Sequence, residues 1–244
     1  MTNDTLKALL EEQYLMAGRG ENPDFAALTG FFGVENDGAL SREILALYGK
    51  LRSIPFPEQW LSQQLELYGQ ADTPPEETAW GKALLEEARS LILTASQMLD
   101  EAVSRAESGA VYSDKGLSAL QEEAEALRQF PSFNWDGSKL LLDGVFAGHR
   151  LMPKRNADPF DKEYVKSRRD GAKKLAERAA ALFPSDAAGF RADMEALYPV
   201  VRCFFQLTKD FSVRMAAAKE AAGVADFSDF AAFALKLVAS PDGT

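Results

Sequence analysis

Apolar residues recur along most of the chain at alternating spacings of three and four residues, which places them on one side of an α-helix. Three segments keep this spacing longest, over residues 76–107, 161–183 and 186–222. In the first of them the apolar stripe runs through Trp80, Leu84, Ala88, Leu91, Ala95, Met98 and Ala102. At the rise of an α-helix these segments predict helices roughly 35–55 Å long. Such lengths favour an elongated multi-helix bundle with coiled-coil-like packing.

Shorter amphipathic segments predict further helices over residues 2–17, 41–53, 114–130 and 134–148. Another begins at Pro57, and the last begins after Asp226. Proline and glycine separate these segments by short loops. Because no stretch alternates apolar and polar residues between hairpin turns, the expected fold is all-α without a sheet. We find no linker and no internal repeat, so residues 1–244 are expected to form a single helical domain.

Composition excludes several classes of function. Hydrophobic residues make up 46% of the chain and charged residues 26%, which is typical of a folded protein. The single Cys203 and single His149 exclude an internal disulfide, a cysteine zinc cluster and an HExxH metal site. The sequence contains no phosphate-binding GxxxxGK[ST] loop and no GxGxxG. It has no membrane-length apolar run and no signal-peptide pattern at its beginning, which predicts a cytoplasmic protein without a membrane partner.

Residues at three positions could take part in chemistry, but each also has a simple structural explanation. Asp226 and Asp229 are interpreted as a helix cap with a carboxylate in the first turn rather than as a metal or acid–base pair. His149 is expected near the C-terminus of a helix, where the helix dipole favours a cation. Cys203 lies in an apolar helix and is expected to be a buried, unreactive thiol. The sequence therefore predicts neither catalytic residues nor metal ligands.

The charge distribution gives a sharper signal. The whole chain has a net charge of -10, yet residues 148–174 contain nine cations and only four carboxylates. A basic loop followed by a basic helix in an acidic protein suggests contact with phosphate groups. The alternative is a face of cations that pair with acidic helices of the same bundle.

The basic residues follow a pattern of their own. Arg150, Lys154 and Arg155 are expected on a loop, and four more cations recur at spacings of four, three and four residues along the next helix. We hypothesise that this set contacts the DNA backbone without reading bases. The predicted DNA-binding residues are Arg150, Lys154, Arg155, Lys162, Lys166, Arg169 and Lys173.

Several stretches taken in order resemble AddA-type proteins, the helicase–nuclease A subunits of bacterial double-strand-break repair. The motifs that carry the resemblance are Leu47-Tyr48, Arg52-Ser53, Pro55-Phe56-Pro57-Glu58, Trp60-Leu61, Val165-Lys166, Arg169-Asp170, Lys173-Lys174 and Asp226-Phe227-Ser228-Asp229. The family usually has leucine where this chain has Phe230. Each motif is weak alone, whereas their order and spacing are specific, and they span nearly the whole chain.

The resemblance implies that the chain is a fragment, a helical accessory domain inserted in the first motor domain of an ATP-dependent DNA helicase and exonuclease. The ATP-binding loop, the Walker B acids and the nuclease motifs of the family are absent here, so the fragment alone is not expected to be an enzyme. ATP and Mg²⁺ are implied for the parent protein only. The implied partners are the duplex DNA backbone, the remaining motor and nuclease domains, and a second helicase–nuclease subunit. The alternative function is a non-catalytic helical scaffold that packs against the partner nuclease subunit without touching DNA.

Overall fold

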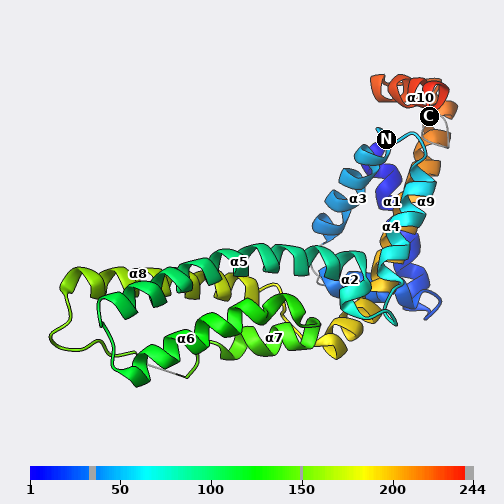
Figure 1. The fold of residues 1–244 in the computed structure, drawn as a ribbon. Helices are drawn as coiled ribbons and strands as arrows, with labels where there is room; N and C mark the ends of the chain where they lie inside the picture. The colour runs from blue at the N-terminus through cyan, green and yellow to red at the C-terminus, as the bar shows by residue number, and fades with distance from the viewer. Residues whose placement is uncertain (33–36, 149–150, 240–244) are drawn as a thin grey trace. The chain divides into compact units, whose positions relative to one another are not determined.

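The chain folds into α-helices joined by short loops (Figure 1). The computed structural model describes residues 1–32, 37–148 and 151–239, and these residues contain no β-strand. The expected all-α fold is therefore confirmed.

Contacts between Cα atoms divide the chain into two compact units, residues 1–71 with 192–244 and residues 72–191. The described helices of the first unit are α1 (Thr2–Gly18), α2 (Pro23–Phe32), α3 (Asp37–Leu51), α4 (Pro57–Tyr68), most of α9 (Ala187–Ala222) and α10 (Phe227–Val238). The second unit contains η1 (Pro75–Glu77), α5 (Ala79–Ser108), α6 (Asp114–Gln129), η2 (Phe130–Ser132), α7 (Trp135–Gly144) and α8 (Pro159–Ala180). That residues 1–244 form one accessory domain stays a prediction.

The first unit has its own hydrophobic core. The side chains of Phe25 in α2, Ile44 in α3 and Phe211 in α9 are fully buried in it. Phe211 also meets Tyr48 edge to face, with 5.0 Å between the ring centroids. Helices that are separated by more than 150 residues in sequence are thus held together by apolar burial, which is the main stabilising term in folding.

In the second unit, α5 and α8 run antiparallel along a seam of small residues. Ala88, Ala95 and Ala102 of α5 are fully buried, as are Ala172 and Ala179 of α8. Small side chains let two helix backbones approach closely and pack over many turns. The seam explains why two such long helices remain side by side.

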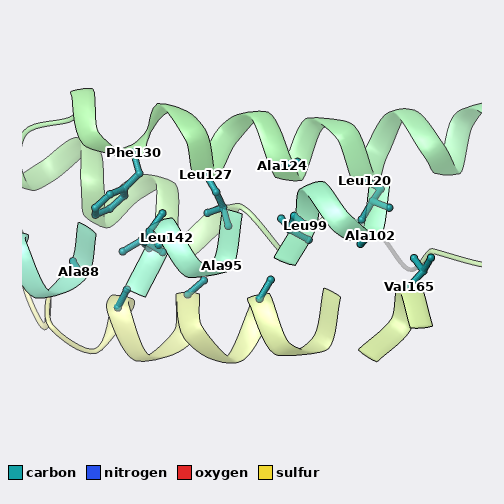
Figure 2. Close-up of a cluster of buried hydrophobic side chains, with 14 of the residues drawn as sticks. Ala88, Ala95, Leu99, Ala102, Leu120, Ala124, Leu127, Phe130, Leu142 and Val165 are labelled. Carbon is teal, nitrogen blue, oxygen red and sulfur yellow. The ribbon is translucent and has the colours of Figure 1, made fainter. Parts of the chain in front are cut away.

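The other wall of this core is formed by α6 and α7. Figure 2 shows Leu120 and Leu127 of α6 pointing into the same cluster as Leu99 of α5 and Leu142 of α7. At one end, Trp135 packs edge to face on Phe183, and its indole N–H donates a hydrogen bond to the carbonyl of Ser185. Larger side chains therefore fill the space that the alanine seam leaves.

Each long helix of the second unit begins at a side chain that caps it, and so does α7. Thr78 accepts a hydrogen bond from the Gly81 amide at 2.9 Å, and Asn134 accepts one from the Gly137 amide at 2.9 Å. Asp158 does the same at the start of α8. Such caps satisfy amides that have no partner within the helix, so they fix where it begins.

The three long helices appear where the sequence predicts them, as α5, α8 and α9. Three details differ. Helix α2 was not expected, and the helix expected over residues 134–148 ends at Gly144. Trp80, expected in the buried stripe of α5, leaves 41% of its surface exposed, because the most deeply buried face is turned toward Leu85, Ile92 and Leu99.

Candidate nucleic-acid interface

Helix α8 carries most of the basic residues of interest. Asp158 caps it by accepting hydrogen bonds from the amides of Phe160 and Asp161 at 2.8 and 3.2 Å. Pro159 occupies the first turn, where its missing N–H has no consequence. Val165 and Ala172 face the core and are fully buried, so the orientation of α8 is fixed and its polar residues flank this face.

The basic loop is tied to the end of the bundle where α5 ends and α8 begins, which we call the turn end of the second unit. The backbone amide of Lys154 donates to the carbonyl of Val111, which directly follows the turn after α5, at 2.8 Å. The ammonium of Lys162 donates to the carbonyl of Arg155 at 3.0 Å. Lys154 and Arg155 are both exposed, so two loop cations and one helix cation gather at the turn end.

The remaining predicted cations of α8 have different environments. Lys166 is exposed and pairs with no described carboxylate. Lys173 is about half exposed and lies 3.9 Å from Glu177, a weak contact. Arg169 is only 16% exposed and forms two hydrogen bonds with Glu123 of α6, at 2.7 and 2.5 Å. Arg150 lies outside the described residues.

The Arg169–Glu123 pair is largely removed from water. The side chain of Glu123 is 4% exposed, and its hydrogen bonds raise the pKa of Arg169. The guanidinium also lies 5.7 Å from the centroid of the Phe146 ring. Two N–H donors of Arg169 are bonded to the Glu123 carboxylate, so Arg169 holds α8 against α6. Lys166 and Lys173, which precede and follow Arg169 by about one helical turn, are exposed.

A second group of side chains lines a cleft of about 580 Å³ between α5 and α8 at the turn end. Phe160 and Tyr164 of α8 are stacked, with ring centroids 6.5 Å apart and 29° between the planes. The residues that line the cleft are Asp100, Glu101, Ser104, Arg105, Ser108, Phe160 and Tyr164. Sequence reasoning missed the two aromatic rings, because an apolar residue at the start of a helix gives no sign of whether it is exposed.

Ion pairs hold both ends of this aromatic pair. Arg105 lies 5.7 Å from the centroid of Phe160 and is bonded through Nε to Asp161 at 2.6 Å. A side chain at Gly109 would collide with Asp161, since a Cβ there would lie 2.4 Å from the carboxylate oxygen. At the other end Arg168 lies 5.3 Å from the centroid of Tyr164 and 2.8 Å from Glu101.

The other residues with a chemical interpretation behave as structural groups. Asp226 accepts hydrogen bonds from the amides of Ser228 and Asp229 and so caps α10, as expected. Arg52 and Lys219 bind this carboxylate and lower the pKa of Asp226, a network that the sequence did not indicate. Cys203 is buried, as expected, and burial raises its pKa to about 12. His149 lies outside the described residues.

Within residues 1–32, 37–148 and 151–239, no three histidine, cysteine or carboxylate side chains are grouped to hold a metal ion. Nor is any helix in this part of the chain both long enough and apolar enough to cross a membrane.

Comparison with known proteins gives a consistent family relationship. No family model matches the chain. Proteins named as the A subunit of an ATP-dependent helicase/nuclease match almost all of it: the protein of Geobacillus thermodenitrificans is 31% identical over 253 aligned positions, covering 99% of this chain and 20% of its own length. Those of Ruminiclostridium cellulolyticum and Acetivibrio thermocellus are 28% and 29% identical, with 99% and 98% of this chain covered. The chain thus spans about a fifth of the length of these curated relatives, and the resemblance to AddA-type proteins is confirmed: the chain is homologous to one segment of the helicase/nuclease A subunit.

Proposed function

We propose that this chain is a DNA-engaging accessory region within the A subunit of an ATP-dependent helicase/nuclease that acts in double-strand-break repair and recombination. It holds the backbone of duplex DNA while motor domains elsewhere in the same protein move along a strand. The remainder of that protein supplies the ATP and Mg²⁺ sites and the nuclease, and a second helicase–nuclease subunit completes the assembly.

The observation that carries the proposal is a set of exposed cations without described counter-ions. Lys154, Arg155 and Lys166 are exposed and pair with no described carboxylate, and Lys162 and Lys173 lie on the same stretch of loop and helix. The chain as a whole has a net charge of -10, so a stretch with three exposed cations that pair with no described carboxylate stands out against its average. Cations that repel one another on one surface are stabilised when phosphates bind between them.

Arg169 has a separate role within this proposal. Its guanidinium is bonded to the buried Glu123, so it positions α8 and does not itself reach for a phosphate. The phosphate contacts are assigned to lysine and arginine side chains that carry no information about base sequence. The proposed binding is therefore independent of sequence and sensitive to salt.

Equilibrium binding to a fluorescently labelled blunt duplex, measured by anisotropy over a salt series, tests the proposal. If about three phosphates are neutralised, the logarithm of the association constant should fall with the logarithm of salt concentration at a slope of roughly -2.7. The variant Lys154→Glu, Arg155→Glu, Lys166→Glu should lose binding at low salt without losing helix content. It leaves the Arg169–Glu123 pair intact, so the fold is not disturbed.

A matched control separates local contact from overall charge. Arg42, Lys82 and Arg89 are also exposed, and reversing their charges changes the net charge by the same amount. This control should bind duplex nearly as well as the parent chain. If it loses affinity equally, or if the parent shows no duplex binding at low salt, duplex contact by this surface is refuted.

One feature favours the scaffold function as a second candidate. Phe227, Phe230 and Leu237 on α10 are 91%, 62% and 87% exposed. Large apolar side chains concentrated on one exposed helix are typical of a protein–protein contact. In the complete helicase/nuclease chain, Phe227→Ser with Leu237→Ser should weaken assembly with the second subunit, whereas DNA binding should not change. Unaltered assembly would rule out α10 as that contact.

A further inference from the structure

Phe160 is exposed to an extent that its environment does not explain. The ring is 68% exposed in the first turn of α8, although α5 and Tyr164 lie next to it. Leaving an aromatic ring in water gives up the favourable free energy of burying its apolar surface. Much of the surface of this side chain is thus open to a ligand.

The ring is held in place before any ligand binds. Tyr164 is stacked on one side of it, and the Tyr164 hydroxyl donates to Glu101 at 3.1 Å. Arg105 is fixed by Asp161 and lies 5.7 Å from the Phe160 centroid. A wall whose side chains are already ordered loses little conformational entropy on binding.

The opposite wall of the cleft has polar groups suited to a nucleobase. Asp100 and Glu101 present carboxylate oxygens, and Ser104 and Ser108 present hydroxyls. Each carboxylate is already paired with an arginine, Asp100 with Arg128 at 2.9 Å and Glu101 with Arg168 at 2.8 Å. Carboxylates repel phosphates but accept hydrogen bonds from the amino groups of bases. The cleft is therefore better suited to a base than to the backbone.

Cations for the backbone lie at the same end of the unit. Lys154 is anchored to Val111 just after α5, and Lys162, two residues after Phe160, is bonded to the carbonyl of Arg155. The N-terminus of α8 thus combines an exposed ring with basic side chains. Proteins that bind single-stranded nucleic acid use this combination of aromatic stacking and cations along the backbone.

We propose that the cleft between α5 and α8 binds one unpaired base of a single-stranded DNA extension, stacked on Phe160, with the adjoining phosphates held by Lys154 and Arg155. This inference rests on the proposed function, in which Lys154, Arg155 and Lys166 contact DNA. It adds the form of DNA that the chain prefers, which is a duplex with a single-stranded end. A protein partner that covers Phe160 is the competing explanation, and the experiment below separates the two.

The test compares a blunt duplex with the same duplex carrying a short single-stranded extension that contains 2-aminopurine. The parent chain should bind the extended DNA more tightly and quench 2-aminopurine fluorescence on binding. Phe160→Ala should weaken binding of the extended DNA about tenfold, within the range for loss of one base–aromatic stack. It should also abolish the quenching and leave affinity for the blunt duplex unchanged, whereas Phe160→Trp should retain both properties.

Phe31→Ala is the matched control, because Phe31 is 66% exposed, close to the value for Phe160, and belongs to the first unit. It should behave like the parent chain. Equal binding of extended DNA by Phe160→Ala and the parent, or quenching that survives the substitution, overturns the cleft assignment while duplex binding stands. If the parent chain does not bind the blunt duplex at low salt, the proposed function is refuted instead. In that case, binding of the extended DNA that depends on Phe160 still supports the cleft assignment.

Discussion

Arg169 of α8 and Glu123 of α6 form a doubly hydrogen-bonded ion pair between two helices, and the two residues are 46 positions apart in sequence. The carboxylate is 4% exposed and the guanidinium 16%, so water screens their attraction weakly. The spacing of cations along α8 places Arg169 among the predicted DNA contacts. In the structure, Arg169 instead attaches α8 to α6.

Breaking this pair from one side should destabilise the fold. Glu123→Ala removes the buried carboxylate that holds the poorly hydrated guanidinium of Arg169, and it is expected to lower the free energy of unfolding by about 3 kcal/mol. Replacing both partners, as Arg169→Met with Glu123→Leu, should recover most of that loss, because no buried charge is left unpaired. Urea denaturation measures both. Asp143→Ala, which breaks the more exposed pair with Lys139, should change stability by less than about 1 kcal/mol.

The same double substitution separates positioning from contact. If Arg169 acts by holding α8 in place, Arg169→Met with Glu123→Leu should bind duplex DNA with nearly the affinity of the parent chain. Anisotropy measurements at low salt check this expectation. A loss as large as that of the Lys154, Arg155 and Lys166 variant would instead make Arg169 a direct phosphate contact.

The alanine seam between α5 and α8 should not tolerate larger residues. Ala172 is fully buried against α5, so Ala172→Leu has to push the helices apart or distort their side chains. We expect a loss of about 1–3 kcal/mol in the free energy of unfolding. Lys174→Leu, two residues away on the exposed side of α8, serves as the control. Equal stability of the two variants would show that the seam can open.

The ion network at the start of α10 should make the first unit sensitive to acid. Arg52 lowers the pKa of Asp226, and the Asp226 backbone together with Lys219 lowers that of Asp229. A depressed folded-state pKa stabilises the fold at pH values above the unfolded pKa, about 3.9 for aspartate, and this contribution disappears as the pH falls toward the folded value. The urea midpoint of the parent should therefore drop more between pH 7 and pH 3 than that of Asp226→Asn with Asp229→Asn.

An exposed carboxylate outside this network provides the comparison. Asp193 of α9 forms no ion pair with the described residues, so Asp193→Asn should keep the acid sensitivity of the parent chain. If the Asp226 and Asp229 variant loses stability with acid as steeply as the parent, the sensitivity originates elsewhere.

Cys203 should resist thiol reagents in the folded protein. Burial raises its pKa to about 12, so at pH 8 only about one molecule in 10,000 carries the thiolate. The side chain is also 7% exposed, which blocks access. A chromogenic disulfide reagent should react far more slowly without urea than in a denaturing concentration of urea. Equally fast reaction in both conditions would contradict the buried environment.

Local sequence determined most of the helices, because their signals lie within a few residues. The spacing of apolar residues located α5, α8 and α9, and Asp226 marked the start of α10 with its own carboxylate. Burial of Cys203 followed from its apolar neighbours. The excess of cations in residues 148–174 could also be counted in advance, since charge is a property of composition alone.

Tertiary structure decided which of these residues are available to a ligand. Lys166 and Arg169 share a spacing that places both on one stripe, yet Lys166 is exposed while Arg169 reaches the buried Glu123. Trp80 and Phe160 were left exposed by the way α5 and α8 pack together. Helical periodicity states which residues share a face, but burial and ion pairing depend on what a distant segment places opposite that face. Only the packing of α6 and α5 against α8 supplies that information.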